Sequence, residues 1–183
     1  MSLPQLGTLQ VRPVTDRPDL LPSPVLAALA GWPAADRVGV AEIDPELADT
    51  AACSEAYDVP LEAGANCVVV AGRRDGQERV AACVVRADTR ADVNNRVKKL
   101  LDVRKCSFLS MDRAVEESGM EYGGITPVGL PDGWRLLVDS RAVELDVALI
   151  GSGVRRSKLL LPGALLAELP RAEVVDGLAA AGG

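Results

Sequence analysis

The chain has 183 residues, a formal net charge of −6 and 48% hydrophobic residues, but aromatic residues make up only 3%. This length favours one domain, and the hydrophobic content argues against global disorder. The negative charge excludes a general field that attracts nucleic acid, and so few aromatic rings argue against a platform that stacks successive bases. Any contact with RNA must therefore come from a local patch.

The sequence contains no histidine, and its four cysteines are widely spaced. A usual zinc site and a histidine-based catalytic triad are therefore not expected, and we expect no metal and no cofactor. No signal peptide and no run long enough to span a membrane are found, so we expect a cytoplasmic protein with reduced thiols and no membrane partner. A general base, if one exists, would be a carboxylate, a lysine, the substrate or a positioned water.

The first third of the chain is rich in proline and precedes a buried strand. Ser23 and Pro24 predict the cap and first residue of a short helix that ends at Gly31. Asp44 and Pro45 open a second helix, which the pattern extends to about residue 57. Strands are predicted at residues 8–14 and 37–43.

A hairpin and an amphipathic helix follow. Asp75-Gly76 is a typical hairpin turn between strands predicted at 67–71 and 79–85. Apolar residues in 92–101 follow helical spacing, and the opposite face carries Arg96, Lys98 and Lys99. Such a face is usually only solvated, but phosphate contact is the functional alternative.

The rest of the chain alternates strands with short helices. Ser110 predicts a helix cap and Gly119 a helix stop. Further strands are predicted at 104–109, 134–138, 146–150, 157–161 and 172–175, a helix at 162–169, and a frayed tail at 178–183. The strands at 146–150 and 157–161 suggest a second hairpin.

These elements predict an α+β fold: a single domain with a mixed, mostly antiparallel central sheet flanked by helices. We expect the strands at 67–71, 79–85, 134–138 and 146–150 to share that sheet. Residues 1–36 are predicted as an N-terminal extension that packs on the core, residues 37–177 as the main domain, and residues 178–183 as a flexible tail.

The segment 121–133 is the most informative part of the chain, with four glycines and two prolines in thirteen residues. Glycines allow backbone amides to approach a ligand closely, and prolines hold a loop in one shape. Such a loop can bind an anion or a developing oxyanion. A purely structural crossover loop is the alternative, and local composition does not decide between the two.

Three stretches together resemble a known family: Glu117-Ser-Gly-Met-Glu-Tyr-Gly-Gly-Ile-Thr-Pro-Val-Gly129, Asp92-Val-Asn-Asn-Arg-Val-Lys-Lys-Leu100, and Leu137-Val-Asp139 with the later Leu149-Ile-Gly-Ser-Gly153. With the order of elements over residues 38–175, they resemble the YbaK/prolyl-tRNA synthetase-associated domain family of aminoacyl-tRNA deacylases. The resemblance implies an editing enzyme that hydrolyses the ester between a small amino acid and the 3′ end of a tRNA. It also implies that the substrate's ribose hydroxyl helps position the water.

The resemblance assigns candidate residues to the site. Gly123, Gly124 and Asn66 are the expected catalytic positions, with loop amides as oxyanion donors. The expected substrate contacts are Ile125, Thr126, Pro127, Asp139, Gly151, Ser152 and Gly153, and the expected tRNA phosphate contacts are Arg96, Lys98 and Lys99. One departure stands out: the family usually has a lysine where this chain has Ala65 or Asn66.

Several alternatives stay open from the residues alone. Asp139 binds the substrate amine or caps a helix, Thr126 bonds the ligand or its own backbone, and Gly151–Gly153 lines the cleft or forms a bulge. Cys67 is more often a small core residue than a nucleophile. The missing lysine keeps a non-catalytic tRNA- or aminoacyl-binding module as the main alternative to the deacylase, with a hydrolase of another small ester as a weaker one. Oligomeric state is not indicated.

Overall fold

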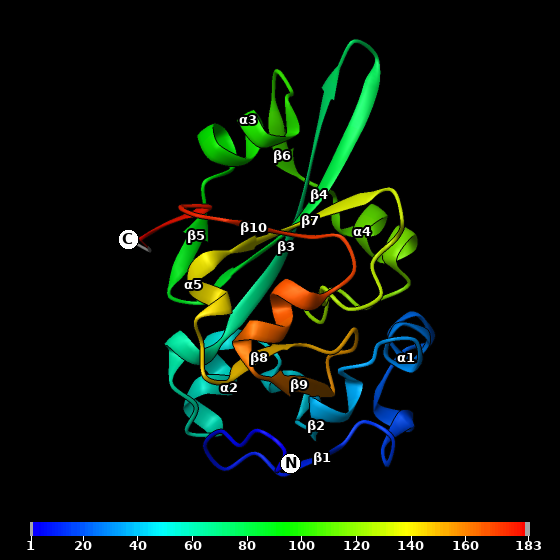
Figure 1. The fold of residues 1–183 in the computed structure, drawn as a ribbon, viewed down its shortest axis with the longest axis vertical. Helices are drawn as coiled ribbons and strands as arrows, with labels where there is room; N and C mark the ends of the chain where they lie inside the picture. Colours follow the sequence, from blue (N-terminus) through cyan, green and yellow to red (C-terminus); the bar gives the residue numbers. More distant parts are fainter. Residues whose placement is uncertain (1, 182–183) are drawn as a thin grey trace.

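The structure is a computed structural model that describes residues 2–181. Its centre is a five-stranded mixed sheet in the order β10-β7-β4-β3-β6. The two long strands β3 (Ala65–Arg74) and β4 (Gln77–Arg86) form an antiparallel hairpin that reaches one end of the molecule (Figure 1). Its turn uses Asp75 and Gly76, both with positive φ, as the sequence predicts. Strands β7 (Trp134–Asp139) and β10 (Ala172–Val175) add parallel pairings, and β6 (Cys106–Phe108) pairs antiparallel with β3.

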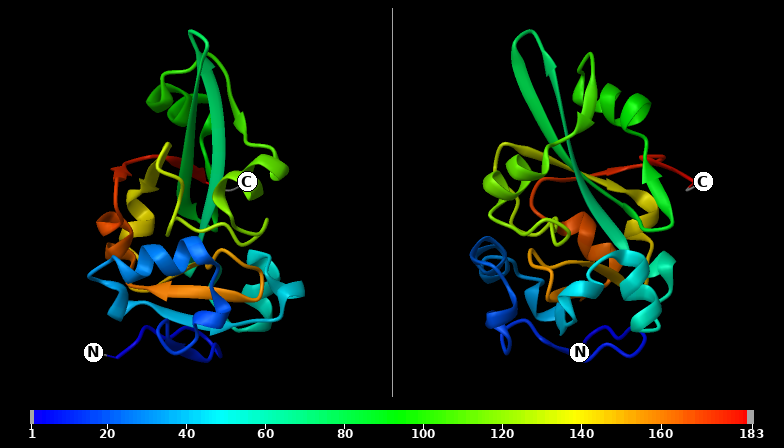
Figure 2. Two further views of the ribbon diagram at one scale, coloured as in Figure 1. Left: turned by 90° about the vertical axis from the view of Figure 1, so that its right-hand side faces the viewer. Right: turned by 180° about the vertical axis from the view of Figure 1, so that it is seen from behind.

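A four-stranded antiparallel sheet lies at the opposite end of the molecule, near the N-terminus (Figure 2). Its order is β1 (Val11–Pro13), β2 (Gly39–Glu42), β9 (Ser157–Leu161) and β8 (Ala148–Gly151). The hairpin of β8 and β9 is confirmed. The prediction that residues 146–150 belong to the central sheet was wrong, because β8 forms its ladder with β9. An isolated parallel bridge joins Leu149 to Gly64, the residue before β3.

A small third sheet involves the end of the chain. Strand β11 (Ala179–Ala181) pairs antiparallel with β5 (Thr89–Ala91), which the sequence pattern did not predict. The frayed tail predicted at 178–183 therefore does not hold for residues 179–181, because backbone pairing fixes them. Residues 182 and 183 lie outside the described part.

The helices are short and mostly follow the predicted signals. They are α1 (Ser23–Ala30), α2 (Thr50–Ala56), α3 (Lys98–Leu101), α4 (Met111–Ser118) and α5 (Ser140–Val143). Gly119 ends α4 in the left-handed conformation, as predicted. A π-helical turn, Val93–Val97, precedes α3, and 3-10 turns cover Pro18–Leu20, Ala35–Arg37, Pro45–Leu47, Leu61–Ala63 and Gly163–Glu168.

Three helix predictions need correction. Ser23 is the first residue of α1 rather than its cap, since extended backbone ends at Pro22. The helix predicted from Asp44 to about 57 is split: Asp44 caps a 3-10 turn by accepting from the Glu46 amide, and α2 begins only at Thr50. The helix predicted at 162–169 is a 3-10 helix.

The largest core cluster lies between the two main sheets. It combines inward-facing residues of β4, β7, β8 and β9 with Leu20, Val25 and Leu29 from the N-terminal region. A second cluster packs α3 and β11 on the other face of the central sheet. A third packs α2 against β2, β8 and β9. These clusters fix the start of β3, the end of β8 and the start of β9 next to one another.

Candidate active site

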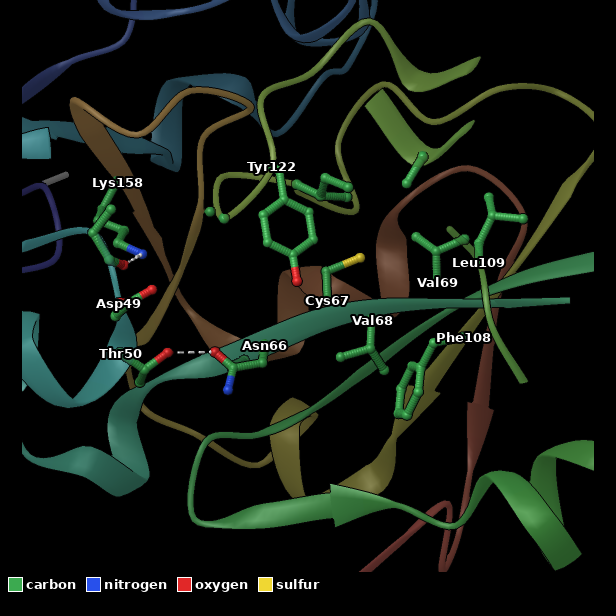
Figure 3. A pocket seen from close by; sticks show the side chains of 16 residues that line it. Asp49, Thr50, Asn66, Cys67, Val68, Val69, Phe108, Leu109, Tyr122 and Lys158 are labelled. Atoms are coloured by element: carbon green, nitrogen blue, oxygen red, sulfur yellow. Dashed lines mark hydrogen bonds between the residues drawn. The ribbon is translucent and has the colours of Figure 1, made fainter. Parts of the chain in front are cut away.

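A cavity of about 330 Å³ opens where β3 begins (Figure 3). Four of the candidate residues line it together: Asn66, Gly123, Ile125 and Gly151. The structure therefore brings the start of β3, the glycine-rich loop and the end of β8 to one place. A cavity of this size is at the lower end of the range for small-ligand sites.

Backbone hydrogen bonds hold the glycine-rich loop against the end of β8. The Glu121 amide donates to the Gly153 carbonyl at 2.8 Å, and the Gly153 amide donates to the Gly124 carbonyl at 2.6 Å. The Glu121 carboxylate accepts from the Arg155 amide at 2.7 Å. The close approach of the loop to the end of β8 requires a glycine at position 151, because a Cβ there would lie 2.5 Å from the Ile125 carbonyl oxygen.

The loop has a donor arrangement that differs in detail from the expected one. The Gly124 amide donates within the loop to the Glu121 carbonyl at 3.0 Å, so it is not free for a ligand. The amides of Gly123 and Ile125 have no backbone acceptor among residues 2–181. Both residues line the cavity, and Gly123 has a positive φ of 82°. The Tyr122 amide likewise has no acceptor in this part of the chain, so the amides of Tyr122, Gly123 and Ile125 are the candidate oxyanion donors of the loop where it lines the cavity.

Asn66 is held by a neighbour from α2. The Thr50 hydroxyl donates to the Asn66 side-chain oxygen at 2.7 Å, and Figure 3 shows the Asn66 amide nitrogen pointing away from Thr50. This fixed orientation leaves the amide N–H groups as donors. Ala65 is buried beside it and also lines the cavity, so neither residue brings a charge to the start of β3.

Lys158 on β9 is a site residue that the sequence analysis missed. Only 8% of it is exposed, it lines the cavity, and its ammonium donates to the Ala48 carbonyl at 2.8 Å. Burial lowers the pKa of Lys158 below its usual value; Arg155 adds to this effect and Asp49 opposes it. The available signal was a lysine inside the apolar run Ser157–Leu161, because lysine is almost never buried without a partner.

Cys67 lines the same cavity but is not activated. Its pKa is raised well above the ordinary value by burial, with a smaller contribution from Cys83. The thiol is therefore protonated near neutral pH, and a thiol is a poor nucleophile compared with a thiolate. This agrees with the interpretation of Cys67 as a small apolar residue rather than a nucleophile.

Asp139 does not line the cavity. It is 1% exposed and caps α5 by accepting from the Arg141 amide at 3.0 Å, while its other contacts go to the Arg141 guanidinium and the Ala179 amide. Burial opposes ionisation, but these hydrogen bonds outweigh it and lower the pKa of Asp139 below its usual value. Of the two open interpretations, the geometry matches the helix cap and not a substrate contact.

The remaining loop candidates are placed around the cavity rather than in its lining. Thr126 is fully buried and its hydroxyl accepts from the Val128 amide at 3.5 Å. Ser152 is buried and bonds the Ser157 hydroxyl and carbonyl. Gly153 packs on Pro22, and Pro127 lines a separate cavity of about 200 Å³ beside Trp32 and Trp134. These residues support the loop.

The basic residues before β6 lie on the surface around α3. Arg96 and Lys99 are exposed and Lys98 is half-buried. Arg96 donates to the Asp176 carbonyl at 3.2 Å. Their assignment as tRNA phosphate contacts stays a prediction.

A hollow of about 640 Å³ adjoins the cavity beside the first residues of β3. It shares Asn66, Val68 and Phe108 with the cavity and is lined further on by Arg90 and Asn94. Phe108 is 65% exposed and stands between the two spaces. Within residues 2–181 no cluster of three metal-ligating side chains occurs, and no helix is long and apolar enough to cross a membrane.

The fold and the cavity define a compact α+β domain that can enclose a small ligand under a glycine-rich loop. A family model described as the aminoacyl-tRNA editing domain matches residues 44–169. The chain belongs to this family, and the matched range contains the start of β3, the glycine-rich loop and Lys158.

Solved structures agree on the fold. A protein described as a candidate trans-editing enzyme for prolyl-tRNA synthetase superposes with a TM-score of 0.71 at 18% identity, over 84% of this chain and 93% of that chain. A protein described as hypothetical protein APE2540 gives 0.64 at 23% identity, over 73% and 85%. A candidate signal-transduction protein from Marinobacter aquaeolei VT8 gives 0.59 at 20% identity, over 87% of this chain and 31% of that chain.

Proposed function

We propose that this protein is a trans-acting deacylase that hydrolyses the ester between a small amino acid and the 3′ end of a tRNA. The observation that carries the proposal is the cavity of about 330 Å³ in a domain of the editing family, with the glycine-rich loop as one wall. Its apolar lining combines the small side chains of Cys67, Val69 and Ala114 with larger ones, Leu109, Phe108 and Tyr122, that take up part of the space. Such a lining favours a small substrate side chain over a large one.

In the proposed reaction, a water oxygen attacks the ester carbonyl carbon. The bond from that carbon to the ribose oxygen then breaks, and a proton passes to the ribose oxygen to give a free amino acid and a tRNA with a free hydroxyl. The carbonyl oxygen becomes negative on the way, and the amides of Tyr122, Gly123 and Ile125 are the backbone donors available to it. Loss of one such donor typically lowers the rate by about 10²–10³. The resemblance to the editing family implies that the ribose hydroxyl next to the ester helps to position the water, so the reaction does not need the histidine that this chain lacks.

The hollow beyond Asn66 and Phe108 suits the terminal nucleotide. It adjoins the cavity, with which it shares lining residues, and Phe108 offers one aromatic face to the base. With Arg96, Lys98 and Lys99 as phosphate contacts, affinity for tRNA falls as salt rises. A cytoplasmic location is part of this proposal.

The test is a panel of purified tRNAs, each charged with one labelled amino acid from glycine to tryptophan. The expected result is release of small amino acids well above the uncatalysed rate, falling as the side chain grows. One missing or added methylene is worth only about 1–3 kcal/mol, so selection between near neighbours is modest. No release from any charged tRNA contradicts the deacylase.

The binding-module alternative is favoured by one observation, the absence of a charge at Ala65 and Asn66. It predicts that the same charged tRNAs bind, measured by fluorescence anisotropy, and are not hydrolysed. If the charged tRNAs bind but are not hydrolysed, the binding module is the correct interpretation and the deacylase is rejected.

A further inference from the structure

The lining of the cavity differs in character from one end to the other. Lys158, Asp49, Thr50 and Asn66 lie at one end, while Val69 and Leu109 lie at the other (Figure 3). The charged groups come from β9 and from the segment before α2. An occupant of this cavity is therefore charged or polar at one end and apolar at the other.

The register of β8 and β9 places the Lys158 side chain on the same face as the glycine-rich loop. Lys158 is directly opposite Gly151 in the antiparallel ladder, and directly opposed residues project to the same face of a sheet. The missing Cβ of Gly151 points at the backbone of Gly124 and Ile125. The buried ammonium and the loop amides thus border the same space.

The contacts of Lys158 leave part of its hydrogen-bonding capacity unused. An ammonium has three N–H donors, and within residues 2–181 the one acceptor bonded to Lys158 is the Ala48 carbonyl. Asp49 also lines the cavity and is exposed, and no ion pair joins it to Lys158 in the described part of the chain. A buried cation with spare donors and an exposed carboxylate therefore face one cavity without neutralising each other.

An aminoacyl ester carries matching groups on adjacent carbon atoms: an α-ammonium and a carbonyl oxygen. We infer that Lys158 donates to the ester carbonyl oxygen and that Asp49 holds the α-ammonium, which directs the amino-acid side chain toward Val69 and Leu109. The inference rests on the proposed function. Lys158 keeps its proton throughout, and its charge opposes the negative charge that develops on the carbonyl oxygen during attack by water. In this chain the cation of the site comes from β9 and not from the start of β3.

The first test measures kcat and KM for Lys158→Met and Lys158→Gln on the best substrate of the panel. Loss of a preorganised electrostatic donor is expected to lower kcat about 100-fold with little change in KM. Thermal unfolding is expected to occur at the same or a higher temperature, because a methionine of similar length removes a desolvated charge. Lys105→Met, which alters an exposed lysine that does not line the cavity, is the matched control and is expected to behave as wild type. Turnover by both Lys158 variants at the wild-type rate overturns the inference. A loss confined to tRNAs that carry aspartate or glutamate also overturns it, because Lys158 would then bind the side-chain carboxylate instead of the ester carbonyl.

The second test concerns the α-ammonium. N-acetylation removes the positive charge from the substrate, so wild type is expected to prefer the free amine by about tenfold in kcat/KM, which corresponds to about 1.4 kcal/mol. Asp49→Asn is expected to abolish this preference, while Asp36→Asn, an exposed carboxylate elsewhere, is expected to preserve it. A wild type that hydrolyses both forms equally refutes the inference, even if the Lys158 variants do not fold.

A third measurement separates failure of this inference from failure of the proposed function. 3′-Alanylamino-3′-deoxyadenosine presents the α-ammonium and the carbonyl but replaces the ester with an amide. If wild type hydrolyses no charged tRNA, the deacylase is contradicted. If Asp49→Asn and Lys158→Met bind this analogue more weakly than wild type does, while their control variants bind it equally well, the inferred roles of Asp49 and Lys158 in binding the aminoacyl group are still supported. Equal binding by all of them contradicts it.

Discussion

The two polar walls of the cavity are built in different ways. The wall formed by residues 121–125 presents the backbone of Gly123 beside the Tyr122 side chain (Figure 3). Backbone bonds to Gly153 and a bond from the Arg155 amide to the Glu121 carboxylate hold it in place. The opposite wall is made of side chains from three separate segments: the Ala48–Thr50 stretch, Asn66 and Lys158. The loop wall depends on glycines that stand close together in the sequence, so a short stretch of sequence is enough to predict it. The opposite wall depends on which distant residues the fold brings together, and no short stretch of sequence shows this.

The largest expected effect comes from the loop wall. Gly151→Val would place a Cβ 2.5 Å from the Ile125 carbonyl oxygen and 2.7 Å from that of Gly124, so the loop must move. We expect turnover to fall by about 10²–10³, as for loss of an oxyanion donor, and unfolding free energy to fall by about 1–3 kcal/mol. Rates and denaturant unfolding measure both. Gly133→Ala is the matched control, because no atom lies within 4 Å of its added Cβ. An active Gly151→Val would show that the loop geometry is not limiting.

Asp139 belongs to neither wall of the cavity, so its replacement is expected to change stability without changing turnover. Asp139→Ala leaves the Ala179 amide and the Arg141 guanidinium without their buried acceptor, so we expect the unfolding free energy to fall by about 1–3 kcal/mol. Turnover of the folded protein should be unchanged. Urea unfolding with Asp36→Ala as control measures the effect. If turnover by Asp139→Ala falls while the protein stays folded, Asp139 contributes to catalysis or substrate binding.

The same residue gives a pH dependence. The folded pKa of Asp139 is below its ordinary value of 3.8, so the unfolded chain binds this proton more readily than the folded protein does. Its stabilisation is therefore fully present above pH 3.8 and is lost as the pH falls through the folded value. The difference in stability between wild type and Asp139→Ala should shrink in acid. A constant difference would mean that the carboxylate charge is not involved.

A charge swap tests whether the wall opposite the loop needs a lysine from one particular strand. Asn66→Lys in the Lys158→Met background places an ammonium at the start of β3, beside the same cavity. We expect it to recover turnover about tenfold, a difference of about 1.4 kcal/mol in barrier height. Asn66→Lys alone should gain little, since Lys158 already supplies the charge. A larger gain in the single variant than in the double variant would contradict this division of roles.

The smallest effect is expected at Thr50. Thr50→Val keeps the shape of the side chain but removes the hydroxyl that donates to Asn66 at 2.7 Å. Loss of one such bond is worth about 1 kcal/mol, so turnover should fall about fivefold through a looser Asn66 amide. Steady-state kinetics measure it, and a Thr50→Ser variant, which keeps the hydroxyl, serves as control. Equal rates for both variants would show that the orientation of Asn66 has no influence.

The comparison also explains how far the sequence could predict this molecule. Local signals predicted the Asp75-Gly76 hairpin and the helix stop at Gly119, because turn and cap chemistry depends on neighbouring residues. They did not predict that β8 leaves the central sheet or that β11 pairs with β5. Those pairings are set by long-range contacts that have no local pattern.

The same distinction between local signals and long-range contacts applies to the site residues. Asn66, Gly123, Ile125 and Gly151 were expected and lie together. Lys158 was missed because only the ladder of β8 and β9 brings it to the glycine-rich loop. Asp139 was a sequence candidate that α5 and β11 use instead.

The most direct test of the central claim, that this cavity holds the amino acid of a charged tRNA, is the hydrolysis of alanyl-tRNA by two variants at one position. Cys67 lines the cavity and its thiol is protonated, so Cys67→Ala should hydrolyse this substrate at about the wild-type rate. Cys67→Phe fills the cavity and should hydrolyse it at least about 100-fold more slowly while tRNA binding persists, since only the aminoacyl end is excluded. Equal hydrolysis by the two variants would place the reaction elsewhere on the molecule.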